Sequence, residues 1–78
     1  MQVTVHYFAA LRERAGCSQA LVEAQSAVAV GDLYAQLFPA GPEGSLPVMF
    51  AVNQEYVGAE HCLTDGDEVA FIPPLGGG

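Results

Sequence analysis

Hydrophobic and polar residues alternate over residues 2–8, which is the pattern of a strand with one buried face. One face would carry Val3, Val5 and Tyr7, and the other Thr4, His6 and Phe8. The alternation stops at residues 9–15, which are rich in helix formers and are followed by Gly16 in the position of a left-handed cap. We therefore expect a first strand that leads directly into a short helix.

A second helix is predicted at residues 30–38, where Val30, Leu33 and Leu37 recur at helical spacing. This apolar stripe can lie across a sheet while Gln36 faces water. Alternation and turn residues predict the remaining elements, which are strands at 19–24, 48–53, near 56–57 and at 68–72, turns at 53–54 and 65–67, and a loop at 40–47.

The order of these elements contains too few helical crossovers for a doubly wound parallel sheet. It fits the α+β class, with a mixed five-stranded sheet packed on one main helix and an additional short helix. In the last strand, alternation would turn Val69 and Phe71 toward the helix and Ile72 away from it. The second face of the sheet is then left open.

The chain ends in Leu75-Gly76-Gly77-Gly78, directly after Pro73 and Pro74, which cannot donate ladder hydrogen bonds. Glycine is costly in entropy to hold in place, so we expect a domain at 1–74 and a flexible tail at 75–78. Backbone without β-carbons can enter a narrow tunnel, and six extended residues reach on the order of 20 Å. The tail could therefore bring its terminal carboxylate into another protein's active site, although a frayed glycine end is the plain alternative.

The net negative charge of the chain indicates which kinds of partner it can bind. Nine acidic residues stand against only Arg12 and Arg14, with no lysine, so the formal net charge is −7. Phosphate backbones repel such a surface, so we expect no nucleic-acid partner and favour a basic protein groove, although spread carboxylates also keep a small protein in solution. No apolar stretch approaches the roughly 20 residues of a membrane span, and we expect a cytoplasmic protein without membrane contact.

The residue types that bind metals or act as nucleophiles are present but poorly arranged for either role. His61 and Cys62 are adjacent, and neither pairs with another ligand type at the spacing of a structural zinc site, so we expect no metal. We interpret Cys62 as a small buried hydrophobe and Cys17 as a turn residue, both reduced. The acidic residues Asp65, Asp67 and Glu68 are interpreted as parts of a tight turn rather than as an acid–base pair or a calcium site; the role of His6 is open.

Three segments together resemble the small subunit of molybdopterin synthase, and the likeness spans nearly the whole chain. They are residues 7–13 (YFAALRE) with Gly16, residues 51–54 (AVNQ), and residues 63–74 (LTDGDEVAFIPP) followed by the closing Gly77-Gly78. The resemblance implies a ubiquitin-like β-grasp fold. It also implies a cycle in which an adenylating, E1-like enzyme uses ATP to activate the carboxylate of Gly78, and a sulfur donor then converts it to a thiocarboxylate.

In that family the large synthase subunit receives the tail, in a heterotetramer, and the sulfur goes to cyclic pyranopterin monophosphate. The resemblance thus implies a carrier that is no enzyme on its own and binds no cofactor. It also implies that Gly78 carries the reacting group and that Gly76 and Gly77 let it pass through the narrow entrance of the partner's active site. Alternation leaves Phe8 and Ile72 on the open face, and the first and last strands of a β-grasp are neighbours. The resemblance implies an apolar contact surface at these same positions and at Tyr56, and the partner-binding residues that we expect are Phe8, Tyr56, Ile72, Pro73, Pro74 and Leu75.

Three other functions fit the same tail. A carrier for thiamin biosynthesis or for tRNA thiolation would share the tail and the fold. A protein modifier would be conjugated through Gly78 to target lysines; because this chain has no lysine, it could not form chains through its own side chains. A β-grasp interaction module would carry the tail without using it.

Overall fold

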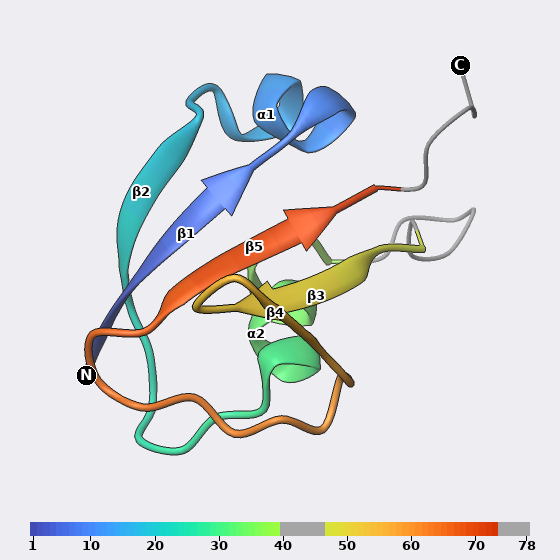
Figure 1. The fold of residues 1–78 in the computed structure, drawn as a ribbon. Helices are drawn as coiled ribbons and strands as arrows, with labels where there is room; N and C mark the ends of the chain where they lie inside the picture. Colours follow the sequence, from blue (N-terminus) through green and yellow to red (C-terminus); the bar gives the residue numbers. More distant parts are fainter. Residues whose placement is uncertain (40–46, 74–78) are drawn as a thin grey trace.

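A computed structural model describes residues 1–39 and 47–73 of the chain (Figure 1). Within them the elements are β1 (Gln2–Tyr7), α1 (Ala9–Ala15), β2 (Gln19–Glu23), α2 (Val30–Leu37), β3 (Met49–Val52), β4 (Glu55–Val57) and β5 (Glu68–Ile72). Their order and type agree with the sequence prediction, and the bounds differ by one residue or so at several ends. The loop predicted at 40–47 and the tail at 75–78 lie outside the described residues, except for Pro47.

The five strands form one sheet in the order β2-β1-β5-β3-β4. The central strand, β5, is parallel to its neighbour β1, with Val5 beside Val69 and Tyr7 beside Phe71. The other neighbouring strands are antiparallel. Figure 1 shows α2 lying behind this sheet, across one of its faces, and α1 beside the end of β1. The predicted α+β class, with a mixed five-stranded sheet on one main helix, is confirmed.

The core lies between the sheet and α2. Val5, Val69 and Phe71 have no exposed surface, and Val3 and Leu33 are 1% exposed, as alternation and helical spacing predicted. The predicted helix stripe was incomplete. The aromatic residues Tyr34 and Phe38 are buried as well, whereas Leu37 is only half-buried. The buried face of α2 is therefore broader than the stripe, because positions three and four residues apart share one side of a helix.

The short helix α1 anchors to the core through Leu11, which has no exposed surface. Ala15, the last residue of the helix, is exposed. Gly16 ends the helix at φ +79°, and its N–H donates to the carbonyl of Arg12 at 3.0 Å, so the predicted left-handed cap is confirmed. Within the part of the chain that the structure describes, neither helix is long and apolar enough to cross a membrane.

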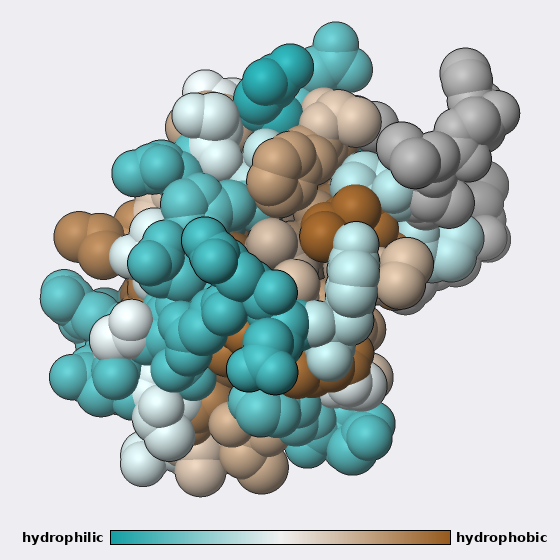
Figure 2. All heavy atoms as spheres, in the orientation of Figure 1, coloured by the Kyte–Doolittle hydropathy of each residue, from teal (hydrophilic) through white to brown (hydrophobic). Residues whose placement is uncertain are grey.

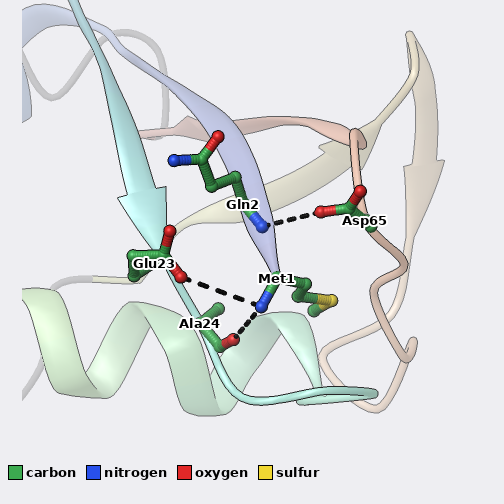
Figure 3. A network of polar contacts seen from close by, with 5 residues as sticks. All are labelled: Met1, Gln2, Glu23, Ala24 and Asp65. Carbon is green, nitrogen blue, oxygen red and sulfur yellow. Dashed lines mark hydrogen bonds and ion pairs between the residues drawn. The ribbon is translucent and has the colours of Figure 1, made fainter.

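Polar contacts hold the first residues of the chain against two other segments (Figure 3). The amine of Met1 donates to the carbonyl of Ala24 at 3.0 Å and lies 3.8 Å from the carboxylate of Glu23. The N–H of Gln2 donates to Oδ1 of Asp65 at 2.8 Å. The start of β1 is thus tied both to the end of β2 and to the turn that precedes β5.

The turn before β5 is organised by the carboxylate of Asp67. The N–H of Thr64 donates to its Oδ2 at 2.8 Å, and the side-chain amide of Asn53 donates to its Oδ1 at 3.0 Å. Gly66 supplies the positive φ, +87°, that the turn requires. The interpretation of Asp65 and Asp67 as parts of a turn therefore agrees with the structure, whereas Glu68 is the first residue of β5.

The hydrogen bonds to Asp67 predict a stability change in acid. The N–H of Thr64 holds the pKa of this carboxyl below its ordinary value of 3.8, with help from Asn53 and the Thr64 hydroxyl, and outweighs an opposing effect of partial burial. A lowered folded-state pKa gives stability above the unfolded pKa, and this stability is lost as the pH falls through the folded value, below 3.8. Asp67→Asn should therefore cost about 0.5–1 kcal/mol at pH 7 and less at pH 2, because the site is largely solvated.

Urea unfolding at pH 7 and at pH 2 measures this difference. Glu60→Gln is the matched control, because it removes one carboxylate at a site away from the turn. An Asp67→Asn chain with the same loss at both pH values would contradict the assignment.

Candidate functional site

The face of the sheet opposite α2 is the open one, and Figure 2 shows it in the orientation of Figure 1. Hydrophobic side chains gather over the ends of β1 and β5 and the start of β3, whereas hydrophilic side chains cover much of the rest of this view. Strand register explains this gathering, because residues opposite one another on neighbouring strands share a face. Met49 is opposite Ile72, Ala51 is opposite Ala70, and Tyr56 is opposite Ala51.

The predicted partner-binding residues that the structure describes all lie on or beside this face. Phe8 is 47% exposed and Tyr56 is 68% exposed, while Ile72 and Pro73 are half-buried. Tyr7 lies beside Phe71, and Phe8 and Ile72 each come one position later; Phe8 directly follows β1 with extended backbone, and Ile72 ends β5. The structure thus brings Phe8 and Ile72 together, and it sets Tyr56 two strands away from Ile72, across β3.

Met49 is the residue that the sequence reasoning missed. Its side chain is 54% exposed, and its cross-strand partner is Ile72. Met49 therefore extends the apolar surface from Ile72 on β5 to β3, the strand next to the one that carries Tyr56. Met49 and Ala51 are two positions apart in β3, so alternation places Met49 on the open face, and this signal was available in the sequence. We call the set Phe8, Met49, Tyr56, Ile72 and Pro73 the docking strip.

The docking strip lies at the root of the tail. β5 ends at Ile72, and Pro73 follows it directly. The remaining predicted site residues, Pro74, Leu75, Gly76, Gly77 and Gly78, lie outside the described residues. Any protein that covers the docking strip therefore contacts the chain immediately before the tail begins.

Beside the docking strip the same face is hollowed, with a volume of about 250 Å³. Its floor carries Ala51 and Ala70, which are cross-strand partners with small side chains. Phe8 borders the hollow, as do Gln54, His6 and Glu68. Nε2 of His6 lies 3.1 Å from Oε1 of Glu68, a contact that sequence reasoning did not anticipate because it joins residues 62 positions apart.

The hairpin turn between β3 and β4 positions Gln54 on this rim. Asn53 and Gln54 have φ values of +51° and +71°, which a two-residue turn of the tight hairpin type requires at both central positions. The turn predicted at 53–54 is therefore confirmed. Asn53 also fixes the start of β5, because its side-chain oxygen accepts from the N–H of Glu68 at 3.0 Å.

One prediction about the cysteines was wrong. Cys62 was expected to be a buried hydrophobe, but it is exposed. Its backbone forms an isolated bridge with Ala29, so the chain is held there by backbone pairing and needs no burial of the thiol. Cys17 is exposed in the bend after α1, in agreement with its interpretation as a turn residue. Among the described residues, no three His, Cys, Asp or Glu side chains are grouped to hold a metal ion.

Comparison with known proteins shows which family the chain resembles. Residues 5–78 match the ThiS family. Three curated proteins, each called a molybdopterin synthase sulfur carrier subunit, align with the chain over nearly its full length. The one from Chlamydomonas reinhardtii is 45% identical and covers 100% of both chains. The one from Mycobacterium tuberculosis is 40% identical and covers 100% of this chain and 99% of the relative. The one from Escherichia coli is 38% identical and covers 97% of this chain and 99% of the relative.

Solved structures agree with the fold. SAMP1 from Haloferax volcanii superposes with a TM-score of 0.78 at 27% identity, over 100% of both chains. A chain in the protein–protein complex of subunits 1 and 2 of molybdopterin-converting factor from Helicobacter pylori superposes with a TM-score of 0.66 at 25% identity, also over 100% of both. The predicted ubiquitin-like β-grasp fold is thereby confirmed.

Proposed function

The chain belongs to the ThiS family, and we propose that it is the sulfur carrier subunit of a molybdopterin synthase. The observation that supports this most strongly is the full-length match, at 38–45% identity, with three proteins that carry that name. The closing Gly77-Gly78 supports it independently, because the proposed chemistry needs a terminal carboxylate on backbone without side chains.

In the proposed cycle Gly78 carries the reacting group. A carboxylate is a poor electrophile, so an activating enzyme first transfers AMP from ATP to it, with release of pyrophosphate. A sulfur donor then supplies the sulfur that displaces AMP, and the product is a thiocarboxylate, whose sulfur is a nucleophile. Gly76 and Gly77 let the end of the chain pass through a narrow entrance, and the sulfur is delivered to cyclic pyranopterin monophosphate.

We propose further that the chain is not an enzyme on its own and acts with the large synthase subunit, in a heterotetramer. The Helicobacter pylori complex of subunits 1 and 2 supports a partner of this kind. On our chain the docking strip is suited to that contact, because clustered exposed apolar side chains next to the tail root are typical of protein interfaces. We assign the cycle to the cytoplasm, where thiols such as the exposed Cys17 and Cys62 stay reduced.

Intact mass tests the carrier chemistry directly. We expect the purified chain to gain about 16 Da after incubation with its activating enzyme, ATP and a sulfur source, because one oxygen is replaced by sulfur (atomic masses of about 32 and 16). Omitting ATP is the matched control and should leave the mass unchanged. An unchanged mass in the complete reaction, with an activating enzyme that is active on another carrier, would contradict the proposal.

A protein modifier is the second candidate, and the likeness to SAMP1 favours it specifically, because a related Haloferax volcanii structure is described as a small archaeal modifier protein. In that function the same activated Gly78 would be joined to lysines of other proteins. Immunoblots of cell extract distinguish the two. A modifier gives a ladder of larger adducts that disappears when Gly77 and Gly78 are removed, whereas a dedicated carrier gives one band.

A further inference from the structure

We propose that the hollow on the open face receives an arginine side chain of the large synthase subunit, held between Glu68 and Phe8. The inference rests on the proposed function for the identity of the partner, and it goes beyond that function by stating the chemistry that the partner must present.

The shape of the hollow suits one long side chain. Its floor carries two methyl side chains, Ala51 and Ala70, at the centre of a sheet face whose neighbouring positions carry larger groups. With a volume of about 250 Å³ it lies below the usual range for a small-molecule site, which begins at roughly 300 Å³. The hollow also adjoins the docking strip through Phe8, so a partner seated on the strip covers it.

The charge around the hollow favours a cation. Glu68 is the acidic residue on the rim, and its side chain is 66% exposed. The contact with His6 uses Oε1, and a carboxylate has about four acceptor positions, so capacity is left for further donors. The chain's two arginines lie on α1, where Arg14 sits 5.3 Å over the ring of Phe38. Neither arginine is among the described residues that line the hollow.

Arginine fits this lining better than lysine or an aliphatic residue. The methylene stem would pack on Ala51 and Ala70, while the planar guanidinium donates two parallel hydrogen bonds to a carboxylate and stacks on an aromatic face. Glu68 and Phe8 supply that carboxylate and that ring. An aliphatic side chain would instead desolvate Glu68, His6 and Gln54 without offering them hydrogen bonds, which is unfavourable.

Two substitutions test the charge and the shape separately. Glu68→Gln keeps the volume and removes the charge, and Ala70→Leu fills the hollow. Titration calorimetry against the purified large subunit from the same organism should give an affinity about 10-fold or more lower for each variant, with a weaker salt dependence for Glu68→Gln. Glu60→Gln is the matched control, because it removes the same charge on the other side of the sheet, beside Gly31 and Asp32 of α2.

The partner residue is identified by a double-mutant cycle. Each arginine of the large subunit is replaced by alanine and tested against both the unsubstituted chain and Glu68→Gln. We expect one arginine whose replacement weakens binding to the unsubstituted chain and has little further effect with Glu68→Gln.

Two different failures can be told apart. Wild-type affinity in Glu68→Gln and Ala70→Leu, or the lack of any coupled arginine, overturns the arginine proposal while the carrier function stands. No binding by the unsubstituted chain overturns the proposed function, and this inference falls with it. Circular dichroism and thermal unfolding of both variants establish that each is folded before binding is measured.

Discussion

Removal of Gly77 and Gly78 is expected to abolish sulfur transfer while leaving the stability of the domain unchanged. The deletion takes away the carboxylate that would be adenylated, and the new terminal residue, Gly76, falls two residues, or about 7 Å of extended chain, short of the same point. Every core residue among the described residues lies between Val3 and Phe71, and the deletion leaves all of them in place. The measurement is the conversion of cyclic pyranopterin monophosphate by the reconstituted synthase.

Binding and stability measurements separate this loss from a general defect. The truncated chain keeps the docking strip, so it should still bind the large subunit and compete with the full-length carrier. Gly76→Ala is the matched control, because it keeps the length and the terminal carboxylate and adds one β-carbon. It should reduce transfer only partly. Normal sulfur delivery by the truncated chain would refute the proposed role of Gly78.

The elements were predictable because their signals are local. Alternation in β1 and β5 identified Val5, Val69 and Phe71 as core residues, and each has no exposed surface. The cap at Gly16 and the turn at 53–54 were predictable for a related reason, since positive φ is confined to a few residue types and turn positions. Such features depend on a residue and its immediate neighbours, which the sequence displays directly.

The site was only partly predictable because its features depend on pairing between distant segments. The contact of His6 with Glu68 requires β1 and β5 to be parallel neighbours in one particular register. The hollow requires Ala51 of β3 and Ala70 of β5 to be cross-strand partners on neighbouring strands. The exposure of Cys62 was mispredicted for the same reason, since its backbone bridge to Ala29 is a long-range contact.

Replacement of Phe71 by alanine should remove most of the stability of the domain. Phe71 is fully buried, and the centres of four other aromatic rings lie 5.0 to 6.5 Å from its own, those of Tyr34, Phe50, Phe38 and Tyr7. Truncation of such a residue leaves a cavity and costs about 3–5 kcal/mol. A domain below about 80 residues seldom has more than about 5 kcal/mol in total, so the variant should be largely unfolded at 37 °C.

Urea unfolding followed by circular dichroism measures the loss, with Leu21→Ala as the control. Leu21 is 71% exposed on β2, so its truncation should change the free energy of unfolding by about 0.5 kcal/mol or less. A Phe71→Ala chain within about 1 kcal/mol of the unsubstituted protein would contradict the assignment of Phe71 to the centre of the core, because a fully buried phenylalanine costs more than that.

The deletion of Gly77 and Gly78 and the substitution Phe71→Ala should both reduce sulfur transfer, for different reasons, and temperature separates them. β5 carries Phe71 on its inner face and ends at Ile72, beside Pro73, so unfolding of this strand displaces both the docking strip and the root of the tail. Sulfur transfer by Phe71→Ala should therefore rise and fall with the folded fraction as the temperature changes. The truncated chain should stay folded and inactive throughout, because its defect lies in the missing carboxylate and not in the domain that presents it.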